Sequence, residues 1–307
     1  MSETITVLRA CGRRLAKVVR STGSFESYDR ARTVDLTAVG IDGVDSLEAL
    51  LCRLERRRDC CVVRGAIADR MRTRGVRRLL HRDPATGDEP TLREAPQRWA
   101  ALDFDSLLQP DWIQSTDLPG CACVAIATLP NEFRRVRFIV QATAGHVLKP
   151  GIHLRLWCWL SRPTTGAELK YWLRSAPVDR SIFGAAQVIY TAAPVFLPGS
   201  FDPLPTRRDV VPGEAAVIVP ARLRPPKPRE TRGDRGNGDS IDIDRLVRFV
   251  AGAAVGNRNS ALYWAACRAA ENGGTERAAA LLEEAAVCAG LPTAEAAATV
   301  RSGLRHG

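Results

Sequence analysis

The sequence predicts an α+β protein, with a mixed-sheet core followed by a small all-α helical bundle. Short apolar runs with strand character alternate at irregular spacing with helical patterns over residues 1–221, which is typical of such a core. Residues 222–240 are dense in Pro, Gly and charge and almost free of apolar side chains, so they predict a flexible basic linker. Residues 241–307 are helical in pattern throughout. We therefore expect two domains, 1–221 and 241–307.

The strands of the first domain are predicted from short apolar runs. They are Val7–Ala10, Cys60–Arg64, Trp99–Phe104, Cys121–Ala127, His153–Leu160 and Gln187–Tyr190. Two helices lie between them. One covers Ser46–Arg57, with Ser46 as its cap and leucines at 3.6-residue spacing, and the other covers Thr165–Ser175.

The second domain is divided into helices by clear start and stop signals. A first helix covers Ile241–Val250, and Asn259 begins a second that ends at the Gly pair 273–274. Thr275 begins a third helix, which Gly290 ends, and Thr293 begins a short last one. Each helix has an apolar face that needs a partner, so a bundle of about four helices is expected.

The composition indicates a polyanionic partner. The formal net charge is +10, and the basic residues are almost all Arg, the lysines being Lys17, Lys149, Lys170 and Lys227. Arg binds phosphate oxygens bidentately, so the excess charge favours nucleic acid or nucleotides. A GC-rich genome would account for the ratio of Arg to Lys, although not for the net charge.

The cysteine pattern and the N-terminal sequence predict a cytoplasmic protein. The nine cysteines form no CxxC pair and no zinc-site spacing, which favours buried thiols in a reducing compartment. The N-terminal residues lack the pattern of a signal peptide, and no apolar run approaches the roughly 20 residues that span a bilayer. We expect no membrane association.

The first candidate site is the carboxylate pair Asp103 and Asp105. Alternate side chains of a strand share a face, so both carboxylates would lie together, with Leu102 and Phe104 toward the core. Like charges this close repel unless a cation lies between them, and a divalent ion such as Mg²⁺ suits carboxylate and phosphate oxygens. Phosphoryl chemistry is therefore one hypothesis, and two solvated carboxylates at a strand end are the other.

Further candidates follow along the chain. Strict alternation after Gly151 places His153 and Arg155 on one face of a strand, and with Lys149 they would suit a nucleoside triphosphate. In isolation, His153 would be an ordinary core or edge residue. Asp179 is either a helix N-cap or a third metal ligand, and Arg207 is a candidate phosphate contact.

Taken in order, these residues resemble the motifs of the archaeo-eukaryotic primase superfamily. Asp103-x-Asp105, Gly151-Ile152-His153 and Val178-Asp179 are similar to the three motifs of its primase-polymerase members, in particular those of phages, plasmids and integrated elements. The segments 256–259 and 299–303 resemble the helical domain that follows the primase core. The chain departs from the family at Gly151, where Ser is usual, and residues 1–94 match by position alone.

The resemblance implies a DNA primase-polymerase that transfers nucleotides onto a primer, or starts de novo, on single-stranded DNA in the replication of a mobile element. It implies two Mg²⁺ or Mn²⁺ ions held by Asp103, Asp105 and Asp179, and a triphosphate contacted by His153, with Lys149, Arg155 and Arg207 as helpers. Arg180, Arg258 and Arg301 would contact nucleic acid. The chain lacks a P-loop, so a replicative helicase would be a separate protein.

Other functions remain open from the sequence. A non-catalytic replication initiator, or a module that binds single-stranded nucleic acid, would keep the fold without the chemistry, and the Gly at 151 allows that interpretation. A metal-dependent nuclease would also use clustered carboxylates and a His. A relaxase is disfavoured because the four histidines are scattered along the sequence and form no metal-binding cluster.

Overall fold

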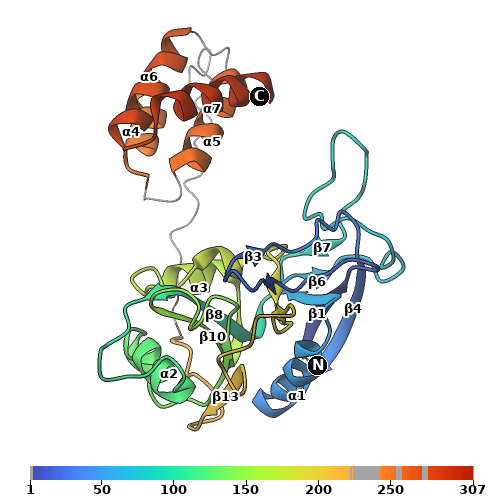
Figure 1. The fold of residues 1–307 in the computed structure, drawn as a ribbon. Coiled ribbons are helices and arrows are strands. Elements are labelled where there is room, and N and C mark those ends of the chain that lie inside the picture. Colours follow the sequence, from blue (N-terminus) through green and yellow to red (C-terminus); the bar gives the residue numbers. More distant parts are fainter. Residues whose placement is uncertain (1–2, 222, 224–242, 254–257, 272–275, 307) are drawn as a thin grey trace. The chain divides into compact units, whose positions relative to one another are not determined.

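The computed structural model describes residues 3–221, 223, 243–253, 258–271 and 276–306. The chain is mixed α+β and divides into two compact units, Met1–Pro228 and Arg229–Gly307 (Figure 1). This boundary falls inside the predicted linker, which lies outside the described residues apart from Leu223. Among the described helices, none combines the length and apolar character that spanning a bilayer requires.

The first sheet of the larger unit has the order β11-β5-β1-β4. It contains β1 (Glu3–Arg9), β4 (Asp35–Ile41), β5 (Cys60–Val63) and β11 (Ile189–Tyr190), all paired antiparallel. Helix α1 (Val44–Glu55) follows β4 and buries the leucines that the sequence places at 3.6-residue spacing. The helix begins two residues before Ser46, whose Oγ instead accepts the backbone N–H groups of Asp42 and Gly43.

The second sheet has the order β13-β9-β10-β8 and carries the predicted site. Its strands are β8 (Gln97–Leu107), β9 (Phe138–Ala142), β10 (Ile152–Thr164) and β13 (Arg208–Val211). Neighbouring strands are antiparallel, and the long strands β8 and β10 place Asp103 opposite Arg155. The two segments predicted as strands therefore lie side by side, and their polar residues Asp103 and Arg155 form a cross-strand pair.

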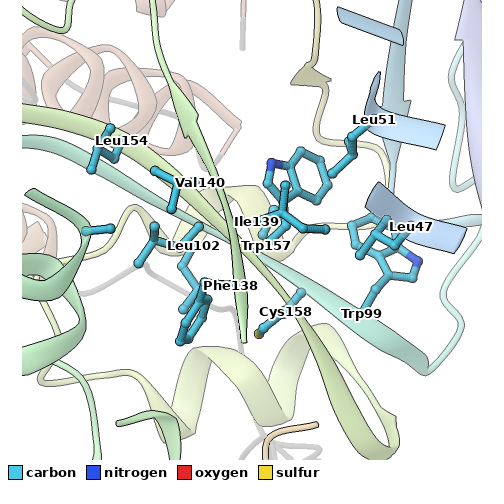
Figure 2. Close-up of a cluster of buried hydrophobic side chains, with 14 of the residues drawn as sticks. Leu47, Leu51, Trp99, Leu102, Phe138, Ile139, Val140, Leu154, Trp157 and Cys158 are labelled. Atoms are coloured by element: carbon cyan, nitrogen blue, oxygen red, sulfur yellow. The ribbon is translucent and has the colours of Figure 1, made fainter. Parts of the chain in front are cut away.

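One hydrophobic core joins α1 to the second sheet. Leu47 and Leu51 of α1 lie in the same cluster as Trp99 and Trp157, whose ring centroids are 5.9 Å apart (Figure 2). Every labelled side chain of this cluster is less than 5% exposed. Close packing of this cluster holds β8 and β10 rigidly, so the backbone that carries the polar residues of these strands is fixed in position.

Short elements complete the larger unit. A small sheet pairs β12 (Val195–Phe196), β2 (Val18–Val19) and β3 (Phe25–Glu26), and β6 (Ala66–Ile67) pairs with β7 (Leu92–Arg93). The remaining helices are α2 (Leu118–Ala127), α3 (Gly166–Trp172) and the 3₁₀ turns η1 (Asn131–Phe133) and η2 (Arg180–Phe183). The β2–β3 hairpin brings Lys17 and Tyr28 of the N-terminal segment near the carboxylates of the second sheet.

The predicted strand at 121–127 is wrong, because these residues form α2. Asp117 caps the helix by accepting the N–H of Gly120 at 2.9 Å, and Pro119 lies in the first turn. Cys121, Ala122, Ala125 and Ile126 are buried at helical spacing. A short apolar run has no period that separates a buried strand from a buried helix, so the cap was the informative signal.

The second unit consists of four described helices with a core of their own. They are α4 (Ile243–Ala251), α5 (Arg258–Glu271), α6 (Glu276–Cys288) and α7 (Thr293–His306). Leu246, Leu262, Leu282 and Val300 are buried together. A Cβ at Gly303 would lie 2.5 Å from the Cβ of Ala266, so α5 and α7 cross where glycine allows a close approach. The four-helix pattern of the sequence is therefore confirmed.

Candidate active site

Asp103 and Asp105 lie near the end of β8, and a bulge separates their environments. Leu102 and Phe104 are fully buried, as the alternation predicts. Between the pairs Phe104–Leu154 and Leu107–Ile152, strand β8 places Asp105 and Ser106 opposite the single residue His153. Ser106 has φ of +62°, a backbone conformation that is rare for residues other than glycine. Such bulges re-aim side chains and are common beside active sites.

The two carboxylates differ in burial. The Asp105 side chain is 70% exposed, whereas that of Asp103 is 14% exposed. Asp103 Oδ2 accepts a hydrogen bond from Arg155 Nη2 at 2.8 Å, and Oδ1 is buried with no hydrogen-bond partner in the described part of the chain. Burial raises the pKa of Asp103, Arg155 opposes this, and Asp105 and Asp179 add to it. Asp103 thus has one oxygen without a partner, which a cation or a donor reaches only if the side chains around it move.

The third predicted carboxylate lies next to the strand that carries the first two. The backbone N–H of Asp179 donates to the backbone carbonyl of Asp103 at 2.9 Å. The Asp179 side chain is exposed and accepts hydrogen bonds from the backbone N and the Oγ of Ser181, both at 2.8 Å. It is therefore the N-cap of η2, and the structure also brings it beside Asp103.

His153 is buried and anchors the bulge. Its Nδ1 accepts the backbone N–H of Ser106 at 3.3 Å, and its Nε2 faces the carbonyl of Pro150 at 2.9 Å. In this arrangement Nδ1 is the acceptor, and Nε2 is the nitrogen placed to donate to a carbonyl. Nδ1 also lies 3.8 Å from Asp105 Oδ1. Both ring nitrogens are thus engaged by the chain in this conformation, and a phosphate contact would require one of them to be released.

Arg155 connects the carboxylates to a tyrosine pair. Besides Asp103, it donates from Nη1 to the carbonyl of Tyr190 at 2.6 Å, and its side chain is 9% exposed. The Tyr190 ring stacks on Tyr28, with centroids 3.4 Å apart and planes within 4°. Arg155 therefore balances the charge of the buried Asp103 and holds β11 against the second sheet.

Two residues of this site come from the N-terminal segment and were missed by the sequence analysis. Lys17 lies with its Nζ 5.6 Å from the Tyr28 ring centroid. Burial, and then the charge of Lys149, lowers the pKa of Lys17, while Asp105 and Asp103 oppose this shift. Lys17 and Tyr28 thus lie within electrostatic reach of the carboxylates. Lysine is scarce in this chain, and two of its four lysines, Lys17 and Lys149, lie near each other here. That scarcity was the only feature of the sequence that singled out Lys17.

The other predicted basic residues are placed differently. Lys149 lies over the Phe25 ring, 5.0 Å from its centroid, on the side of the site formed by β3. Arg207 is buried and engages Asp202 through Nε at 2.6 Å and Nη2 at 2.8 Å, while Nη1 donates to the Thr143 carbonyl. Arg207 therefore has a structural ion pair that occupies its guanidinium.

The remaining predicted nucleic-acid contacts lie on two units. Arg180 is exposed in η2, directly after Asp179. Arg258 and Arg301 belong to the helical unit, where Arg258 Nη1 donates to the Gly290 carbonyl at 3.3 Å and Arg301 is exposed on α7. The side chains of Arg180 and Arg301 are exposed to solvent. Arg258, in contrast, packs against Gly290 at the end of another helix.

The carboxylates fit a divalent cation only if a substrate completes its coordination. Over the described ranges, no three His, Cys, Asp or Glu side chains are gathered closely enough to hold a metal ion by themselves. The unpartnered Asp103 Oδ1 and the exposed Asp105 nevertheless supply the hard oxygen ligands that Mg²⁺ prefers. Mg²⁺ is commonly bound by one or two carboxylates together with substrate phosphates. The donor set fits that type of site.

The glycine at position 151 is required by the local backbone and by a close contact. Gly151 has φ of +84°, and a Cβ there would lie 2.8 Å from the Leu107 carbonyl oxygen. The residue directly precedes β10 and lies against the bulge of β8. Any side chain at 151 therefore meets both an unfavourable backbone conformation and a close contact.

We expect Gly151→Ser to destabilise the larger unit by about 1–3 kcal/mol, because the strain of positive φ is added to the clash with Leu107. Gly23→Ser is the matched control, since Gly23 has φ of +75° and nothing within 4 Å of its added Cβ. Urea unfolding measures both variants. Equal losses in the two variants would show that the contact with Leu107 has no energetic role.

His146 accepts a hydrogen bond from the backbone of His153, and its burial makes the free energy of unfolding depend on pH. His146 is fully buried, and its Nδ1 accepts the backbone N–H of His153 at 3.2 Å. Burial is the main cause that lowers the pKa of His146 from 6.5 to about 4; the charge of Arg207 adds to it, and a hydrogen bond with Ser115 opposes it. Since the unfolded chain takes up this proton near pH 6.5 and the folded chain does not, stability is lost as the pH falls.

The free energy of unfolding should fall by about 3 kcal/mol through His146 as the pH goes from above 6.5 to about 4, at about 1.4 kcal/mol per pH unit. His146→Asn keeps an acceptor for His153 and removes the titration. Urea unfolding at several pH values should therefore give a shallower decline for this variant. Identical declines in the two proteins would exclude His146 as the source.

Comparisons with known proteins give no relative for this chain: no family model, no curated protein and no solved structure matches it.

Proposed function

We propose that the chain is a metal-dependent nucleotidyltransferase, a DNA primase-polymerase that acts on single-stranded DNA. The observation that carries this proposal is that Asp103 and Asp105 on β8 lie within electrostatic reach of Asp179, the N-cap of η2, and that Lys17 and Lys149 lie nearby. Carboxylates next to cationic side chains suit a reaction in which a polyphosphate is bound and displaced. The order of the motifs supports the same class.

In the proposed reaction, the 3′ hydroxyl of a primer attacks the α-phosphate of a nucleoside triphosphate. A phosphodiester bond forms, the bond to the β-phosphate breaks, and pyrophosphate leaves. Asp103 and Asp105, with Asp179, would hold Mg²⁺ or Mn²⁺, and the chemistry supplied there is neutralisation of charge on the transferring phosphate. Lys17 and Lys149 would bind the triphosphate oxygens.

The chain's own residues organise this site before substrate binds. Arg155 holds Asp103 Oδ2 and leaves the buried Oδ1 without a partner, and Asp105 at the bulge is exposed. His153 fixes the bulge through the backbone of Ser106. The carboxylates are therefore held on rigid strands, so binding does not have to order them.

A second candidate function is a nucleic-acid-binding module without catalysis, such as a replication initiator. The observation that favours it is the engagement of His153 and Asp103 by the chain itself, through Pro150, Ser106 and Arg155. In that case the basic surface would bind single-stranded DNA, and the carboxylates would serve the fold. A nuclease remains a less favoured third candidate.

One assay separates these candidates. The full chain is incubated with single-stranded DNA, with and without a primer, together with labelled ribonucleotides or deoxyribonucleotides and Mg²⁺ or Mn²⁺. A labelled new strand supports the proposal, whereas a shortened template supports a nuclease. A mobility shift with neither product supports the binding module and contradicts the proposed enzyme.

A further inference from the structure

A cleft of about 390 Å³ lies beside the stacked pair of Tyr28 and Tyr190. Its floor is apolar and includes the buried side chains of Leu8, Val34 and Cys61. Tyr28 and Tyr190 also line it. The volume falls at the low end of the range for small-ligand pockets, so it suits a single compact ligand with a flat apolar part.

The rim of this cleft is basic. Arg30, Arg32 and Arg78 line it and are exposed. In the part of the chain that the structure describes, Arg30 and Arg32 form no ion pair, and Arg78 donates to the Ala186 carbonyl at 2.8 Å. The acidic side chain at the cleft, Asp29, accepts hydrogen bonds from Arg14 at 2.7 and 3.3 Å. The rim thus has positive charge available for an anion.

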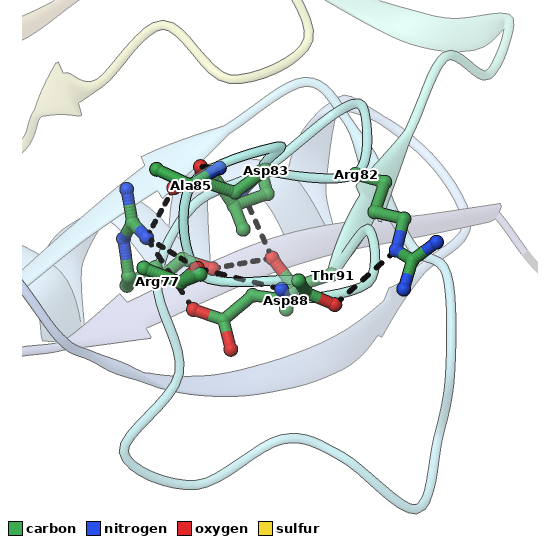
Figure 3. A network of polar contacts seen from close by, with 9 residues as sticks. Arg77, Arg82, Asp83, Ala85, Asp88 and Thr91 are labelled. Atoms are coloured by element: carbon green, nitrogen blue, oxygen red, sulfur yellow. Dashed lines mark hydrogen bonds and ion pairs between the residues drawn. The ribbon is translucent and has the colours of Figure 1, made fainter.

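The loop that carries Arg78 is held in place by its own polar network. Figure 3 shows Arg77 between Asp83 and Asp88, with Thr91 bonded to the Arg77 backbone. The N–H of Asp83 donates to the Asp88 carbonyl at 2.9 Å, which closes the loop on itself. Arg78 is therefore presented from an ordered segment, and less conformational entropy is lost when it binds a ligand.

We propose that this cleft is a second nucleotide site, which takes a base against its apolar and tyrosine surfaces and a phosphate at Arg30, Arg32 and Arg78. Aromatic rings with Arg at the rim are the combination that binds bases and phosphates together. An acidic peptide would use the arginines but not the apolar and tyrosine surfaces. The nucleotide would be either a free triphosphate or one unit of a single strand. The inference requires binding only and does not depend on nucleotidyl transfer.

The test measures binding of the full chain in EDTA, where the proposed metal site is inactive. The probes are a fluorescent adenosine triphosphate and a fluorescein-labelled oligothymidylate, followed by anisotropy. Arg30→Ala/Arg32→Ala should weaken binding of at least one probe by about tenfold. Ala31→Trp, which fills the cleft without a change of charge, should weaken the same probe. Arg53→Ala/Arg56→Ala, in the last turn and at the C-cap of α1, removes equal charge elsewhere and should leave binding within about twofold.

Loss of binding of the triphosphate identifies a free nucleotide as the ligand, and loss confined to the oligothymidylate identifies a strand. Equal behaviour of the rim variant and the α1 variant overturns the site. So does unchanged binding by Ala31→Trp with a native circular dichroism spectrum. Competition by inorganic triphosphate as effective as by adenosine triphosphate overturns recognition of the base. Failure of this inference leaves the extension assay unaffected, and the reverse also holds.

Discussion

Asp105→Asn should abolish primer extension, by about a thousandfold or more, while the protein stays folded. The side chain is 70% exposed and its removal leaves no buried group unpaired, so the variant changes charge at the site and little else. The neutral side-chain amide of Asn binds a divalent cation far more weakly than the carboxylate of Asp does. Steady-state extension of a labelled primer measures the effect.

Asp42→Asn is the control for this prediction, because Asp42 is exposed in the turn before α1. It should extend primers as the unchanged protein does, and both variants should unfold at the same urea concentration. Asp103→Ala should also be inactive, but it leaves the buried Arg155 without its carboxylate, so its fold must be checked separately. Normal extension by Asp105→Asn would contradict the proposed function.

Arg155→Met should destabilise the larger unit by about 3–5 kcal/mol, the range for breaking one partner of a buried ion pair. Asp103 would then hold a charge in a buried position with no guanidinium beside it, and the Tyr190 carbonyl would lose a donor. Met fills most of the same space, so the loss reports mainly on charge and hydrogen bonding. Urea unfolding followed by intrinsic fluorescence measures it.

The double variant Arg155→Met/Asp103→Asn separates the ion pair from other roles of Arg155. Removing the charge of Asp103 should recover a large part of the lost stability, because the uncompensated carboxylate is the main source of the penalty. Additive losses in the double variant would mean that the two side chains are not energetically coupled. A loss below about 1 kcal/mol in the single variant would place the pair among weak surface contacts.

Much of the fold follows from patterns that lie close together in the sequence. Alternation over 152–160 predicts a strand with His153 and Arg155 on one face, and caps and glycines predict the four described helices of the smaller unit. The strand predicted at 121–127 is wrong because all seven residues there are apolar, so the sequence shows no alternation with polar side chains. The cap at Asp117 carries the information instead.

Local geometry predicted only part of the candidate site, whereas Asp179 and His153 were included through the resemblance of the motifs. Asp103 and Asp105 share a strand, so their proximity follows from its geometry. Lys17 and Tyr28 reach the same place through the β2–β3 hairpin and the stacking on Tyr190, and sequence patterns do not encode such long-range contacts. For the same reason, the pairing of Arg207 with Asp202 could not be separated from a phosphate contact in advance.

The sequence by itself determined the α+β class, the boundary region between the units, the carboxylate pair on one strand, and a strand with His153 and Arg155 on one face, because each depends on local periodicity or composition. The tertiary structure decided which oxygen of Asp103 is free, that His153 anchors a bulge, and that Gly151 admits no side chain. It also placed the basic cleft beside the tyrosine pair. These features depend on burial and on contacts between distant segments, which arise only when the chain packs.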